Sequence, residues 1–169
     1  MQTAPGKFAE AWKDFFGTAA GASATLVGLV IVAISVNLQR IIQQPQLPSR
    51  GGATVAALVL MLVTSMAELI PQSGATLAIE ISLFGLLVWL IQLWSARQIV
   101  VAYLESRRPL HEAIIGIAIG QIQAIPFVVG GICLLMGLRA GPSWIAWGMI
   151  SSFILSVVNT WILLVEILR

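Results

Sequence analysis

Charged residues are scarce in this sequence. Of 169 residues, 9% are charged and 59% are hydrophobic. A soluble globular domain carries about 25% charged residues, which it needs to cover its surface with groups that water can solvate. A chain this poor in charge cannot do so, which excludes an ordinary soluble domain. Its surface is accounted for if lipid covers most of it, so we expect an integral membrane protein.

The residues that build metal sites and catalytic centres are also nearly absent. The chain has one cysteine, Cys133, one histidine, His111, and one aspartate, Asp14. One cysteine excludes an internal disulfide, and one Cys with one His cannot form an ordinary Cys/His metal site. No aspartate falls in a predicted span, no nucleophile elbow is found and no glycine-rich phosphate loop follows a strand. We therefore predict a protein that is not an enzyme, with no cofactor and no metal.

A basic surface is missing as well. The formal net charge is +2, and no stripe of Lys and Arg is interleaved with aromatic residues. Such a stripe is the usual signature of nucleic-acid binding, so we predict no nucleic-acid partner. The partner that the composition does imply is the lipid bilayer.

Long uncharged stretches divide the chain into membrane spans, each needing about 20 apolar residues to cross the hydrocarbon core. The fold class predicted is all-α, a bundle in a single domain over residues 1–169. Residues 1–14 form either an interfacial amphipathic segment or an extension of the first helix. A tight turn at 71–74 joins spans two and three as a helical hairpin. The competing interpretation is that these two segments form a re-entrant hairpin that does not cross. The five spans predicted are about 15–38, 53–70, 75–96, 113–138 and 144–168.

The Lys and Arg residues predict an orientation, because loops on the cytoplasmic side carry an excess of them. Three of the nine lie on the side of the N-terminus: Lys7, Lys13 and Arg139. The other six lie on the opposite side: Arg40, Arg50, Arg97, Arg107, Arg108 and Arg169. We therefore expect the N-terminus outside and the C-terminus in the cytoplasm, in a bacterial inner membrane.

Small residues recur at four-residue spacing in the first and last spans. Helices in lipid associate largely through close packing over such residues. Each row packs inside the bundle or forms a contact with another copy or a membrane protein partner, and both readings stay open. In the first span the candidate residues for a helix-packing or oligomer face are Gly17, Gly21, Ala24 and Gly28. In the last span the matching row is Gly148, Ser152, Ser156 and Thr160.

Two carboxylates lie inside predicted spans, where an ionisable group costs roughly 2.5–3.5 kcal/mol near the membrane centre. Glu68 and Glu80 stand on opposite arms of the 71–74 hairpin and could approach one another. Neighbouring carboxylates can share a proton, so the pair is a candidate ion or proton site. The competing interpretation is that both reach outer headgroups and water.

Amides form a second polar set within the spans. Gln121, Gln123 and Asn159 are candidates for lining a polar path. Pro126 removes a backbone donor and should leave one carbonyl unpaired. We expect the glutamines to bond between helices or to satisfy that carbonyl, since amides in spans most often make such bonds.

Several stretches resemble one group of small bacterial integral membrane proteins. They are the span from Gly21 to Leu38, the segment Leu47–Arg50, the Pro71-Gln72 turn and the ending Leu164–Arg169. Some members carry the label "modulator of FtsH protease". That modulator is similar to seven-span proteins, whereas this chain has room for five, so the resemblance implies a small helical membrane protein and no functional residues.

Two functions follow as hypotheses. The first is a non-enzymatic accessory or regulatory membrane protein that acts through helix–helix contacts. The second is a small oligomeric ion or proton channel or transporter, with Glu68 and Glu80 at an outer mouth. The abundance of small-residue faces and the scarcity of deep charges favour the first.

Overall fold

Six helices make up the described parts of the chain. The structure is a computed structural model that describes residues 5–43, 46–105 and 110–161, and no strand occurs in these ranges. The helices are α1 (Pro5–Val36), α2 (Leu38–Gln43), α3 (Gln46–Leu69), α4 (Gly74–Glu105), α5 (Leu110–Leu135) and α6 (Gly141–Trp161).

Five of these helices are long and apolar enough to cross a membrane, which confirms the predicted all-α bundle of five spans. The candidate spans are Trp12–Val36, Leu47–Leu69, Gly74–Glu105, Ile117–Leu135 and Gly141–Trp161. The first begins earlier than predicted and takes in Lys13 and Asp14, whose side chains are exposed. The last part of the predicted fifth span, 162–168, lies outside the described residues.

Several helix boundaries differ from the predicted ones. The α4 helix runs to Glu105 rather than to 96, α5 covers Leu110–Leu135 rather than 113–138, and α6 begins at Gly141 rather than at 144. Residues 5–14 belong to α1 and continue into the first span without a break, and the interfacial placement of this part stays a prediction. The α1 helix ends at Val36 and α2 begins at Leu38, with Asn37 between them; the Asn37 Nδ2 donates to the Ala33 carbonyl at 3.1 Å. The start of α3 lies seven residues before the predicted one, since Pro48 suits a first helical turn.

The turn between α3 and α4 is short and well capped. Ser73 precedes α4, and its Oγ accepts a hydrogen bond from the Thr76 backbone N–H at 3.2 Å. This is the bond that an N-cap residue makes with the first turn of a helix. Both arms are long enough to span, as α3 has 24 residues and α4 has 32. The hairpin therefore has the dimensions of two full crossings rather than of a re-entrant loop.

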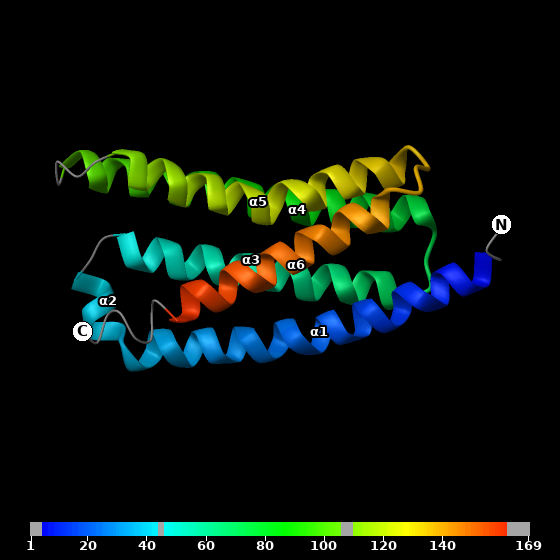
Figure 1. Ribbon diagram of the computed structural model, residues 1–169, viewed down its shortest axis with the longest axis horizontal. Coiled ribbons are helices and arrows are strands. Elements are labelled where there is room, and N and C mark those ends of the chain that lie inside the picture. The colour runs from blue at the N-terminus through cyan, green and yellow to red at the C-terminus, as the bar shows by residue number, and fades with distance from the viewer. Residues whose placement is uncertain (1–4, 44–45, 106–109, 162–169) are drawn as a thin grey trace.

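The helices lie along the long axis of the molecule, with α1 packed on α3, and α4 packed on both α3 and α5. Figure 1 shows α6 crossing the bundle obliquely, from the side of α5 at one end to the side of α1 at the other. The α3–α4 and α5–α6 turns lie at the same end as the start of α1, here called the hairpin end. The opposite end carries α2 and is called the α2 end.

The core at the middle of the bundle is apolar. Phe127, Ile145 and Met149 are fully buried, and Leu60 and Ile81 pack with them. Close approach of α5 and α6 over this core depends on Gly148, where an added Cβ would lie 2.9 Å from the Phe127 Cε2. Small residues thus bring these two helices together, as expected of packing in lipid.

Candidate functional site

The two carboxylates of the α3–α4 hairpin have different surroundings. Glu80 Oε2 accepts a hydrogen bond of 2.9 Å from the Gln72 Nε2, which also donates to the Ala67 carbonyl at 3.2 Å. Gln72 therefore ties Glu80 to the end of α3. Glu68 takes no part in this arrangement, and its Oε1 is buried without a hydrogen-bond partner among the described residues. The hydrogen-bond partner of Glu80 is thus Gln72, and the proton-sharing pair of carboxylates stays a prediction.

Glu68 shares its face of α3 with a second orphaned group. Thr64 lies one turn earlier, is 1% exposed, and has an Oγ1 with no hydrogen-bond partner in the described part of the chain. Ser65 beside it bonds within its own helix, to the Met61 carbonyl at 2.8 Å, and lies 3.8 Å from the Met149 sulfur. A carboxylate and a hydroxyl near the hairpin end thus lack the partners that buried polar groups ordinarily have.

The predicted polar-path amides bond across the bundle toward the α2 end. Trp89 donates from Nε1 to the Gln121 Oε1 at 2.7 Å, and Gln92 donates to the Gln123 Oε1 at 3.3 Å. Both bonds join α4 to α5. Asn159 of α6 donates to the Thr54 Oγ1 of α3 at 3.1 Å. These three bonds connect four helices, so each predicted amide holds a neighbouring helix, which is the commoner role of amides in spans.

The carbonyl freed by Pro126 is not satisfied by a glutamine, contrary to our expectation. Pro126 lacks the N–H that would bond to the Ile122 carbonyl four residues earlier. The Ser151 hydroxyl of α6 lies 3.2 Å from that carbonyl and shares its one proton between it and the Gly148 carbonyl of its own helix, at 3.0 Å. Ser152 donates to the next carbonyl, that of Gln123, at 3.3 Å. A hydroxyl from the neighbouring helix reaches the kink because Gly148 allows α6 to lie against Pro126.

Apolar side chains of α3 lie between Glu68 and Thr64, near the hairpin end, and the amide hydrogen bonds toward the α2 end. Along α3, Thr54 and Thr64 are ten residues apart, or about 15 Å in a helix. The residues between them that face the interior include Leu58 and Met61, which are 0% and 4% exposed. Met149 of α6 is buried and belongs to the same apolar cluster as Met61. Along α3 the two sets are therefore separated by apolar side chains, while Ser152 and Ser156 of α6 are buried between Met149 and Asn159.

The small-residue rows of α1 and α6 have opposite environments. In α6, Gly148, Ser152, Ser156 and Thr160 are all buried, so this row packs inside the bundle. In α1, Gly17, Gly21, Ala24 and Gly28 are all exposed. A Cβ added at any of the three glycines would meet nothing within 4 Å. Packing inside the bundle is therefore the wrong interpretation for the α1 row, here called the α1 stripe.

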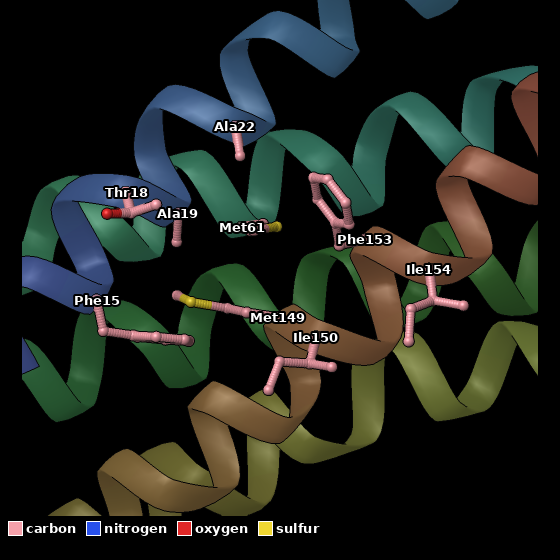
Figure 2. Close-up of a pocket in the computed structure, with 9 residues that line it drawn as sticks. All are labelled: Phe15, Thr18, Ala19, Ala22, Met61, Met149, Ile150, Phe153 and Ile154. Carbon is pink, nitrogen blue, oxygen red and sulfur yellow. The ribbon is translucent and has the colours of Figure 1, made fainter.

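A groove between α1 and α6 was not predicted. It has a volume of about 180 Å³ and is lined by residues of α1, α3 and α6, all drawn in Figure 2. The lining residues follow no pattern of polar and apolar positions in the sequence, and they come from three segments far apart in the chain. Only the packing of the helices brings them together. No group of three or more His, Cys, Asp or Glu residues able to hold a metal occurs in the described ranges.

Comparison with known proteins adds no relative. No family model matches the chain, and neither a curated protein nor a solved structure matches it.

Proposed function

We propose that this protein is a non-enzymatic accessory or regulatory protein of the bacterial inner membrane, which acts by helix–helix contact through the α1 stripe. The partner is the helix of another membrane protein or of a second copy of the chain. The proposal rests chiefly on one observation, the exposure of Gly17, Gly21, Ala24 and Gly28 along one face of α1.

The glycines of the α1 stripe carry a free-energy cost that no contact within the described part of the chain offsets. Glycine in a helix interior is about 0.8–1.0 kcal/mol less favourable than alanine. At Gly148 the chain regains this through contact with Phe127, but at Gly17, Gly21 and Gly28 an added methyl would meet open space. Glycines at four-residue spacing lower the surface of a helix so that a second backbone can approach closely. A partner helix on the stripe would supply the packing that the chain alone lacks.

The orientation that we propose places the hairpin end outside and the α2 end in the cytoplasm. It is supported by the predicted loops, since those assigned to the cytoplasm carry six Lys and Arg residues and those on the other side carry three. Reporter fusions at the two termini test it: a cytoplasm-active reporter should work at the C-terminus and a periplasm-active one at the N-terminus. The reverse pattern would contradict the orientation and leave the contact proposal standing.

The experiment for the contact is co-purification of the full-length protein, expressed at native level and extracted in mild detergent. We expect a membrane protein partner, or a second copy carrying a different tag, to be recovered with the wild type. Ala24→Leu adds three carbon atoms to a side chain of the stripe and should abolish recovery of the partner or second copy. Ala75→Leu makes the same change at an exposed site of α4 and should retain it.

Two results would overturn the contact proposal. One is that the wild type is recovered alone, with neither a partner nor a second copy. The other is that Ala24→Leu and Ala75→Leu retain the partner equally, which would place the contact away from the stripe.

The channel or transporter remains the alternative, and the packing supports it less well. The polar groups stand in two sets separated by Leu58, Met61 and Met149. An ion or proton path through one chain would have to pass these apolar side chains. Liposomes holding the folded protein test it: flux that is lost in Glu68→Gln or Glu80→Gln would favour this function over the accessory one.

A further inference from the structure

The groove between α1 and α6 opens onto the surface that lipid would cover. Thr18 on one rim is exposed, and Ile150 and Ile154 on the other are 44% and 56% exposed. Figure 2 shows the Met149 side chain reaching from α6 toward α1, with Met61 of α3 at the floor. Both methionines are buried. The groove exists because α6 crosses the bundle obliquely and lies near α1 over only part of its length.

The volume and the apolar lining of the groove indicate which kind of molecule it can bind. An engineered apolar cavity of about 150 Å³ holds one benzene molecule, so about 180 Å³ holds a chain segment of roughly six carbon atoms. A transmembrane helix is about 10 Å across and is too wide to enter. Polar backbone would find no hydrogen-bond partner on this lining. An acyl chain needs none, and the flexible methionine side chains at the floor can adapt to its shape.

A carboxylate lies closer to the hairpin end on the face of α3 that carries Met61. Glu68 follows Met61 by seven residues, so the two share a face of α3 and are about 10 Å apart along the axis. The candidate span ends at Leu69, which puts Glu68 at the level of the headgroups. Glu68 is half-buried and does not itself line the groove, and its Oε1 has no hydrogen-bond partner within the described residues. A carboxylate there would be complemented by a cation that donates hydrogen bonds.

We propose that the groove between α1 and α6 is a binding site for a phospholipid whose headgroup carries a primary ammonium. One acyl chain lies against Met61 and Met149, and the ammonium donates to Glu68. This inference is independent of the contact proposed for the α1 stripe. A lipid headed by choline has the same net charge and no N–H donor, so it would fill the groove without bonding to the carboxylate.

The test is a titration of the full-length protein in mild detergent with phosphatidylethanolamine or phosphatidylcholine of identical acyl chains, with bound lipid measured by native mass spectrometry. We expect one lipid per chain and about a fivefold preference for phosphatidylethanolamine, as for one charge-assisted hydrogen bond at a partly exposed site. Glu68→Gln should remove the preference and keep both lipids bound. Ala22→Phe, which fills the groove, should reduce binding of both.

Leu83→Phe is the matched control, since Leu83 is 61% exposed on α4 and away from the groove. It should bind both lipids as the wild type does. Thr18→Phe, at the exposed rim, replaces Ala22→Phe if helical circular dichroism shows that the latter does not fold. Retained binding in the groove-filling variant, or an unchanged preference in Glu68→Gln, would overturn the proposal. So would a wild type in which a second copy occupies the groove and no lipid binds.

Discussion

The same substitution, glycine to alanine, should have opposite effects at two positions of this bundle. At Gly21 an added Cβ meets nothing within 4 Å, whereas at Gly148 it would lie 2.9 Å from the Phe127 Cε2 and 3.1 Å from the Pro126 Cβ. Both positions lie inside helices, so both variants gain the same helix propensity. The difference between them therefore measures the packing alone.

The magnitudes follow from these distances. Gly21→Ala should raise the free energy of unfolding of the isolated chain by about 0.8–1.0 kcal/mol, the propensity difference between the two residues. Gly148→Ala has the same gain but overpacks the α5–α6 contact, which typically costs about 1–3 kcal/mol. Phe127 is fully buried and cannot withdraw easily. We expect a net loss of up to about 2 kcal/mol at Gly148.

The assay is reversible unfolding of the full-length protein in detergent, followed by helical circular dichroism at a concentration where the chain is monomeric. A second measurement, recovery of the partner in mild detergent, should show the reverse ranking at the α1 stripe. There Gly21→Ala weakens the contact although it stabilises the chain. Equal unfolding free energies for the two variants, or destabilisation of the monomer by Gly21→Ala, would refute the assignment of the stripe to the outer surface.

Two further predictions concern hydrogen bonds between helices. The Gln92–Gln123 pair should give a coupling of about 0.6 kcal/mol in a double-mutant cycle of leucine substitutions, the average for such bonds in membrane proteins, measured by the same unfolding assay. A coupling of zero would show that the 3.3 Å bond adds nothing. Ser151→Ala should destabilise the wild type by about 0.6–1.7 kcal/mol but have little effect in a Pro126→Ala background, where a restored backbone N–H can satisfy the Ile122 carbonyl. Equal losses in the two backgrounds would contradict this role of Ser151.

Span lengths could be predicted from the sequence because the bilayer sets them, but helix ends could not. The charge of Arg50 suggested that the second span begins at Ala53, whereas α3 starts at Gln46. A proline two residues into a helix is compatible with its first turn, so Pro48 marks a start rather than a break. The break between α1 and α2 at Asn37, whose side chain bonds to the Ala33 carbonyl, is not visible in a hydropathy pattern.

Which face of a helix points outward is a harder problem in a membrane chain than in a soluble one. A soluble helix reveals its buried side through hydrophobic periodicity, but a helix in lipid is apolar on every side. The spacing of Gly17, Gly21 and Gly28 therefore indicated a packing face without showing what packs on it. The partners of Gln123 and Asn159 were hidden for a related reason, since they depend on the relative register of distant helices.

The α1 stripe and the groove belong to different faces of one helix, and this makes the two proposals separable. Successive helical residues are rotated by about 100°, so Gly21 and Ala24 lie more than a quarter turn away from Ala22. The structure agrees, since Ala22 lines the groove while Gly21 and Ala24 are exposed and line no part of it. Ala24→Leu should therefore abolish recovery of the partner and leave lipid binding unchanged, and Ala22→Phe should do the reverse. If either variant abolished both, the two faces would not act independently, and a change in the position of α1 would have to be the cause.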